Sequence, residues 1–153
     1  CDTILIVDKS EKEFSSTKGH ELMNSHIFGD GRIRQAKSNL SLIIEAFESG
    51  NYELFIKVVE TEALTLHAMM MTSNPYFILM KSNTLKIINS VWEFRIKENS
   101  KLCFTLDAGA NVHLIYPKSE QDLVQRFILE VLSRYCENGK FINDMIGTGP
   151  FKL

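Results

Sequence analysis

Apolar residues recur along the chain at spacings that predict two long helices near its middle. Between residues 32 and 50, and again between 51 and 73, they recur every three or four positions, as they do on one face of an amphipathic helix. Asn51 is placed to cap the second helix, which ends before Pro75 because proline cannot continue a helix. The apolar positions that define these two faces are Ile33, Ala36, Leu40, Ile43 and Phe47, then Phe55, Val59, Ala63, Leu66 and Met70.

Short runs of β-branched and apolar residues predict strands on either side of the helices. The runs at 3–7, 102–106 and 112–116 are bounded by polar or turn-forming residues, and Phe141-Ile142 is a candidate for a final strand. Two further helices are expected from the apolar spacing around residues 85–92 and 119–135. The second of these begins with a capping-box-like pair, Ser119 and Asp122.

The order of these elements is strand, helices, two strands, helix and strand, which indicates an α+β fold. We expect an antiparallel sheet with helices packed on one face and the split βαβ connectivity of ferredoxin-like domains. The chain has 153 residues without an internal repeat or a low-complexity linker. Residues 1–153 are therefore predicted to form one domain.

Composition and charge exclude several classes of protein. Hydrophobic residues make up 44% of the chain and charged residues 24%, which is too apolar for a disordered chain. The net charge of -2 provides no basic field that would attract nucleic acid or an anionic membrane surface. The apolar stretch at 64–71 is far shorter than the roughly 20 residues of a membrane helix. We therefore expect neither nucleic acid nor a membrane as a partner, and any bound anion needs a local site.

The cysteines indicate a reducing compartment. Cys1, Cys103 and Cys136 are odd in number and form no CxxC pair, which argues against a zinc ribbon and against a secreted disulfide framework. No metal site is predicted, and a cytoplasmic location is expected. Because the chain starts at Cys1 and enters a strand-like run almost at once, we also expect it to be one domain of a longer protein.

The first candidate site is the segment 105–111, TLDAGAN. Asp107 follows a buried strand, which would place its carboxylate on a rigid element. Ala108, Gly109 and Ala110 are small and would let another molecule approach the backbone closely. The residues alone leave open a simpler role for Asp107, as a turn carboxylate that accepts hydrogen bonds from nearby amides.

The second candidate is the segment 15–19, SSTKG, which precedes a predicted helix. The hydroxyls of Ser15, Ser16 and Thr17, the Lys18 ammonium and the free amides of a helix start could together hold phosphate oxygens. A plain helix cap without a ligand explains the same residues.

Other chemistry-bearing residues favour structural roles. His67 lies in an apolar helix without a partner histidine at metal-ligand spacing, which is typical of a hydrogen-bonded core histidine. The Gly-rich segments 29–31 and 147–150 lack the Walker lysine and are predicted to be turns. Cys103 alternates within a strand and is expected to be packed inside, not to act as a catalytic thiol.

Three motifs, in this order along nearly the whole chain, carry a family resemblance. They are the strand and SSTKG turn at 15–19, the His67-Ala68 helix followed by Ser73 and Pro75, and FTLDAGAN at 104–111. Together they resemble the C-terminal half of diphosphomevalonate decarboxylase, in the superfamily of galactokinase, homoserine, mevalonate and phosphomevalonate kinases. Related kinases of the superfamily have a different, glycine-rich motif where this chain has residues 104–111. An aspartate followed by Ala-Gly-x-Asn is therefore fairly specific to the decarboxylase family.

The resemblance implies an ATP-dependent decarboxylation that converts mevalonate 5-diphosphate to isopentenyl diphosphate in the mevalonate route to isoprenoids. Asp107 matches the family's catalytic aspartate, which contacts the 3-hydroxyl group of the substrate. Ser16 and Thr17 match positions that bind the substrate's diphosphate. The implied supporting residues are Ser15, Lys18, His67, Ala108, Gly109 and Asn111.

Some family features differ or are absent. Ala110 stands where the family commonly has Pro, and His20 where it commonly has Met. No segment matches the family's ATP-binding Gly- and Ser-rich loop or its substrate-positioning arginine, which belong to an N-terminal domain. ATP with Mg²⁺ is therefore expected to bind mainly to that domain. This chain by itself is expected to be inactive, and a homodimer of the whole protein is possible.

Two alternatives remain open from the sequence. A mevalonate 3-kinase would phosphorylate without decarboxylation, although Asp107 argues against it because the resemblance ties that carboxylate to the decarboxylase branch. A stand-alone α+β module that binds a ligand or partner is the other alternative. An upstream domain with a Gly-Leu-x-Ser-Ser-like segment would favour the enzyme over the module.

Overall fold

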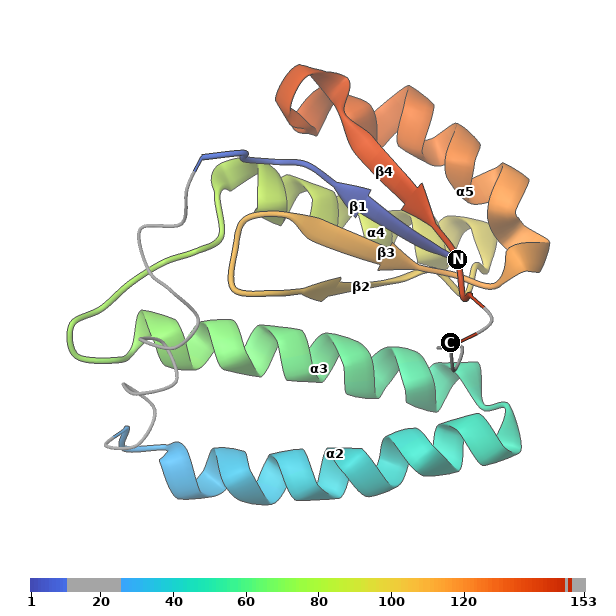
Figure 1. The fold of residues 1–153 in the computed structure, drawn as a ribbon. Coiled ribbons are helices and arrows are strands. Elements are labelled where there is room, and N and C mark those ends of the chain that lie inside the picture. Colours follow the sequence, from blue (N-terminus) through green and yellow to red (C-terminus); the bar gives the residue numbers. More distant parts are fainter. Residues whose placement is uncertain (11–25, 148, 150–153) are drawn as a thin grey trace, which may run out of the picture.

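A computed structural model describes residues 1–10, 26–147 and 149 of the chain. In Figure 1 a small sheet lies beside two long antiparallel helices, with further helices behind it. None of the helices in the described ranges is long and apolar enough to cross a lipid bilayer.

The sheet has four strands in the order β2-β3-β1-β4, and every neighbouring pair is antiparallel. The strands are β1 (Asp2–Leu5), β2 (Cys103–Leu106), β3 (Val112–Ile115) and β4 (Phe141–Asp144). This order and connectivity confirm the predicted α+β fold with split βαβ topology. The candidate final strand is present as β4.

Four α-helices complete the described fold: α2 (Gly29–Ser49), α3 (Tyr52–Met71), α4 (Ser82–Glu98) and α5 (Gln121–Phe127). Helix α5 continues through a wider π turn and a final 3₁₀ turn to Tyr135, so the predicted last helix has the expected extent. Asn51 caps α3 as predicted, because its side chain accepts the amide hydrogen of Leu54 at 3.1 Å.

Helices α4 and α5 cover one face of the sheet, behind the strands in the view of Figure 1. The residues of β1, β2 and β3 that point to this face are buried, and their apolar members pack with apolar residues of both helices. The centre of this core comprises Leu5, Phe104, Val112, Leu114, Ile87, Val91, Val124 and Ile128. Strand residues of the opposite face, such as Ile4, His113 and Ile115, are only half-buried.

Helix α3 lies along the free edge of β2, with α2 on its far side (Figure 1). Two of its buried polar side chains bind backbone groups of that edge. The Glu60 carboxylate accepts the Phe104 amide hydrogen at 3.4 Å, and His67 bonds to the Asp107 carbonyl oxygen at 3.1 Å. An unpaired strand edge is a template for aggregation, so α3 both covers β2 and fixes the chain that leaves it.

The apolar face of α2 is exposed in the structure. Leu40 is 62% exposed, and Phe47 is 70% exposed although its ring lies 5.6 Å from that of Phe55 in α3. Near its N-terminus, α2 makes polar contacts with α3. Arg32 forms an ion pair with Glu62, and Gln35 donates to the Thr65 hydroxyl at 3.1 Å. The apolar spacing therefore predicted the helix but not how much of its apolar face stays exposed.

Three local predictions differ from the structure. Residues 29–31 are the first turn of α2 and not a separate turn, because the helix continues from them without a break. Strand β1 ends at Leu5 and does not reach residue 7. No side chain caps the helix start near Ser119, where Glu120 instead accepts hydrogen bonds from Ser100 and Lys101.

Candidate functional site

Asp107 is the first residue of the loop that joins β2 to β3, here called the Asp107 loop (residues 107–111). In Figure 1 this loop lies at the same end of the sheet as the end of β1 and the connection from α3 to α4. Asp107 is exposed and directly follows the buried strand β2, as the sequence predicted. Three segments distant in sequence therefore meet around one carboxylate-bearing loop.

His67 fixes the first carbonyl group of the Asp107 loop. Its Nε2 atom lies 3.1 Å from the Asp107 carbonyl oxygen, which only accepts hydrogen bonds, so Nε2 carries the hydrogen. The imidazole is buried, and burial lowers its pKa against the opposing effect of the Asp107 carbonyl and carboxylate. His67 is therefore a neutral hydrogen-bond donor that positions the loop, in agreement with the structural role expected for it.

The lowered pKa of His67 predicts a loss of stability in mild acid. The unfolded chain takes up a proton on this histidine as pH falls below about 6.5, whereas the folded chain resists protonation until a lower pH. Stability contributed by the neutral imidazole is thus complete above pH 6.5 and is lost as pH falls toward the folded-state pKa. We expect His67→Gln, which keeps a donor for the carbonyl group, to show a smaller decrease in the free energy of unfolding between pH 7.5 and pH 5.5. Urea titrations at both pH values measure this difference, and equal decreases in the two proteins would contradict it.

The other end of the Asp107 loop is bound by α4. The Thr84 hydroxyl, fully buried in the first turn of α4, donates to the Ala110 carbonyl oxygen at 2.7 Å. The same oxygen of Thr84 accepts the Lys81 amide hydrogen at 3.1 Å. Through these two hydrogen bonds the start of α4 holds the Ala110 carbonyl group in place.

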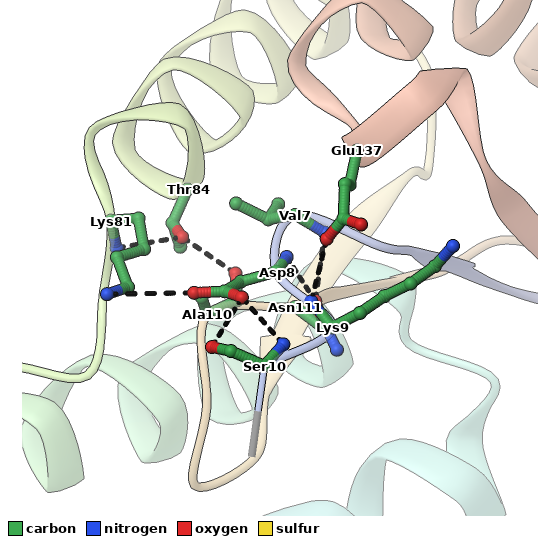
Figure 2. A network of polar contacts seen from close by, with 9 residues as sticks. All are labelled: Val7, Asp8, Lys9, Ser10, Lys81, Thr84, Ala110, Asn111 and Glu137. Carbon is green, nitrogen blue, oxygen red and sulfur yellow. Dashed lines mark hydrogen bonds and ion pairs between the residues drawn. The ribbon is translucent and has the colours of Figure 1, made fainter. Parts of the chain in front are cut away.

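Asn111 joins the Asp107 loop to the chain that leaves β1, as Figure 2 shows. Its Oδ1 atom accepts the amide hydrogens of Val7 and Asp8, at 2.9 and 3.1 Å. These amides follow the last residue of β1 and have left the strand ladder. One side chain therefore satisfies two backbone donors and fixes the direction in which the chain leaves the sheet.

Asp8 links the same segment to the start of α4 (Figure 2). Its carboxylate accepts hydrogen bonds from the amide and hydroxyl of Ser10 at 2.8 and 2.6 Å, and lies 3.6 Å from the Lys81 ammonium. The Ser10 hydroxyl, the Ser10 amide and Lys81 together lower the pKa of Asp8. Asp8 is therefore ionised at neutral pH.

A cavity of about 840 Å³ opens beside these contacts. Its wall contains the last four residues of the Asp107 loop and the exit of β1, with the aromatic rings of Tyr76 and Phe77. Three lysines also line it: Lys9, Lys81 and Lys140. Lys140 lies close enough to lower the pKa of Lys9, and the three lysines outnumber Asp8, the one carboxylate among the described lining residues, so positive charge prevails at this wall. The cavity has the size and charge to suit a small anionic ligand.

The structure brings together part of the predicted site. Ala108, Gly109 and Asn111 line the cavity, and His67 contacts Asp107. The predicted phosphate-binding residues Ser15, Ser16, Thr17 and Lys18 lie outside the described residues, as does His20. Sequence reasoning missed Asp8, Thr84 and the three lysines. Of these residues, only Asp8 could have been recognised as a candidate from the sequence, because it directly follows a strand-like run.

The thiols of the two buried cysteines, Cys103 and Cys136, are not reactive near neutral pH. Burial raises the pKa of Cys103 to about 12, with a further contribution from the Glu60 carboxylate that Arg95 partly opposes. Burial also raises the pKa of Cys136 to about 11. Neither thiol is ionised near neutral pH, as expected for packed cysteines. Within residues 1–10, 26–147 and 149, no group of three or more His, Cys, Asp or Glu side chains is arranged to hold a metal ion.

Comparison with known proteins identifies the family. The model of the mevalonate 5-diphosphate decarboxylase C-terminal domain matches residues 3–148. The chain belongs to this family. The match spans the sheet and the helices around the Asp107 loop, and it confirms the resemblance inferred from the sequence motifs.

Individual relatives of this decarboxylase domain are distant in sequence and close in structure. A phosphomevalonate decarboxylase from Haloferax volcanii is 23% identical over 110 residues, which cover 72% of this chain and 34% of the relative. A mevalonate diphosphate decarboxylase from Legionella pneumophila has a TM-score of 0.83 and 27% identity, covering 93% of this chain and 44% of that protein. The structure of MDDEF in complex with MVAPP, AMPPCP and magnesium has a TM-score of 0.80 and 22% identity, covering 92% and 42%. The decarboxylase domain thus spans less than half the length of these relatives.

Proposed function

We propose that this domain supplies the catalytic aspartate of an ATP-dependent decarboxylase that converts mevalonate 5-diphosphate to isopentenyl diphosphate, ADP, phosphate and CO₂. The observation that carries the proposal is the geometry of the Asp107 loop. Its backbone is bound by His67 at one end and by Thr84 at the other, beside a lysine-lined cavity. A carboxylate on a loop that is already held in place loses little conformational entropy when the substrate binds.

Asp107 acts on the 3-hydroxyl group of the substrate in this proposal. A carboxylate is far less basic than an alkoxide, so it orients the hydroxyl group and accepts its proton late, as the oxygen forms its bond to phosphorus. When phosphate then departs, it takes this proton from Asp107, and the restored carboxylate stabilises the positive charge that develops at the carbon that carried the oxygen. CO₂ leaves as its bonding electrons form the double bond of the product.

Binding of the substrate's phosphate groups is proposed for Ser16 and Thr17, supported by Ser15 and Lys18. The lysines of the cavity wall add positive charge at the same end of the sheet. A second candidate substrate, mevalonate 5-phosphate, is favoured by the Haloferax relative, which is named a phosphomevalonate decarboxylase. The two substrates differ by one phosphate group, so both suit a cationic wall.

ATP is proposed as the phosphoryl donor, with Mg²⁺ to neutralise its charge. The MDDEF complex with AMPPCP and magnesium supports this proposal for the family. We propose that both bind mainly to an N-terminal domain of the intact protein. The intact protein is further proposed to be cytoplasmic, and a homodimer is compatible with the proposal.

An assay of the intact protein tests the function. We expect ATP-dependent release of CO₂ and phosphate from mevalonate 5-diphosphate, with isopentenyl diphosphate as product, and no turnover by this chain alone. Mevalonate 5-phosphate is assayed in parallel, and a larger kcat/KM with the monophosphate would assign the second substrate.

Two outcomes would overturn the proposal. Accumulation of a stable 3-phosphorylated product without CO₂ would indicate a 3-kinase. An intact protein that binds neither substrate nor ATP would indicate a stand-alone binding module. Turnover by this chain alone would contradict the part assigned to the N-terminal domain.

A further inference from the structure

The contact between the exit of β1 and the Asp107 loop depends on one side chain. Asn111 Oδ1 accepts both the Val7 and the Asp8 amide hydrogens, and these two amides lie beyond the last residue of β1. An aliphatic side chain at position 111 would leave both amides without this acceptor. The direction of the chain after β1 therefore depends on the side-chain oxygen of Asn111.

Asn111 also belongs to a closed ring of contacts that Figure 2 draws almost completely. Its neighbour Ala110 accepts the Thr84 hydroxyl hydrogen, and Thr84 in turn accepts the Lys81 amide hydrogen. The Lys81 ammonium then pairs with Asp8, whose own amide returns to Asn111. The ring connects the exit of β1 to the Asp107 loop directly through Asn111 and indirectly through Lys81 and Thr84.

We propose that Asn111 is a positioning residue that sets the distance between the exit of β1 and the Asp107 carboxylate. The inference rests on the proposed function, because its consequence for rate requires that Asp107 be catalytic. The exit of β1 carries Asp8 and Lys9, which line the cavity together with residues 108–111 of the Asp107 loop. Asn111 thereby aligns this part of the cavity wall with the Asp107 carboxylate.

A role in global stability is a weaker explanation of the same contacts. Asn111 is only partly buried, and it lies outside the apolar cluster formed by the sheet, α4 and α5. Its partners are backbone amides of a connecting segment, not groups of the core. Loss of the Asn111 oxygen is therefore expected to loosen one connection while the core stays packed.

Two variants of the intact protein test the role of the acceptor oxygen, because their new side chains have nearly the shape of asparagine. Asn111→Leu keeps the branched side chain but accepts no hydrogen bond, whereas Asn111→Asp keeps an oxygen at the same place. A displacement of about 1 Å between reacting groups costs roughly 100-fold in rate, so we expect Asn111→Leu to lower kcat by roughly 10- to 100-fold. KM for the substrate is expected to change much less, and Asn111→Asp is expected to recover most of the loss in kcat.

Amide hydrogen exchange provides a readout that does not depend on activity. In Asn111→Leu the Val7 and Asp8 amides are expected to exchange faster than in wild type, and in Asn111→Asp they are expected to regain protection. Asn143→Leu is the matched control. It removes an asparagine oxygen that accepts from Thr3 and Gln125 near the start of β1, at 2.9 and 2.8 Å. This control is expected to lower the melting temperature without changing kcat.

Three outcomes would overturn the inference. The first is unchanged exchange at Val7 and Asp8 in Asn111→Leu, which would show that Asn111 does not hold this connection. The second is wild-type kcat in Asn111→Leu, and the third is equal loss of kcat in the Leu and Asp variants. A wild-type protein with no decarboxylation would instead overturn the proposed function itself, together with the catalytic consequence drawn for Asn111.

Discussion

Replacement of Asp107 with asparagine in the intact protein is expected to lower kcat for ATP-dependent decarboxylation by roughly 10²- to 10⁴-fold, the range associated with loss of a general base. Asparagine has the same shape but cannot take the hydroxyl proton or balance positive charge at the reacting carbon. Asp107→Ala is expected to be at least as severe. Release of CO₂ under saturating substrate and ATP measures the effect.

The fold is expected to survive both substitutions at Asp107. The side chain is exposed, and His67 binds the backbone carbonyl group of Asp107, which every replacement retains. Asp122→Asn, on the exposed side of α5, serves as the matched control and is expected to leave kcat unchanged. Circular dichroism and melting temperature verify the fold of each variant. Wild-type turnover in Asp107→Asn would defeat the catalytic assignment.

The largest expected effect on stability is that of Glu60→Ala. The Glu60 carboxylate is almost fully buried and accepts hydrogen bonds from Arg95 at 2.6 and 3.0 Å and from the Trp92 indole at 3.0 Å. It also accepts the Phe104 amide hydrogen of β2. Removal of Glu60 leaves the Arg95 charge without its partner, which is expected to lower the free energy of unfolding by about 3–5 kcal/mol. Chemical denaturation at pH 7 measures the change.

Glu62→Ala on the same helix is the matched control. Glu62 pairs with Arg32 of α2, and a third of its side chain is exposed to solvent, at 33%. Solvent screens such a pair, so the expected cost is about 1 kcal/mol or less. The double variant Glu60→Leu with Arg95→Leu is expected to recover part of the loss, because it leaves neither charge unpaired. Equal destabilisation by Glu60→Ala and Glu62→Ala would contradict the special role of the buried pair.

The buried pair also explains why part of the fold could not be read from apolar spacing. Of the face predicted for α3, Ala63 and Met70 are buried, but Glu60 and His67 are buried as well. These two polar side chains lie seven positions apart and so share one side of the helix, where they bind backbone groups at the edge of β2. The apolar surroundings of His67 indicated its core position, but apolar spacing assigns a carboxylate such as Glu60 to solvent, because it carries no information about which backbone donors and acceptors lack a partner.

Helix α2 shows the converse: apolar spacing does not guarantee that an apolar residue is buried. Its apolar spacing is regular, and the helix forms over the predicted residues, but Leu40 and Phe47 remain exposed. Local spacing determines whether a helix can have an apolar face. It does not determine which neighbour that face meets, because that depends on how α3 is attached to the sheet.

Strands, helices, their order and the α+β topology could all be inferred from the chain, because each depends on local periodicity and on turn and capping residues. The candidate aspartate could be inferred too, since a strand end followed by Ala-Gly-x-Asn is a local motif with a family likeness. The contacts of Asn111 with Val7 and Asp8, and of Thr84 with Ala110, join residues 26 to 104 positions apart. Such contacts arise only when the sheet and helices assemble, because hydrogen bonding depends on positions in space that no local pattern encodes. The tertiary structure thus decided which side chains hold the Asp107 loop.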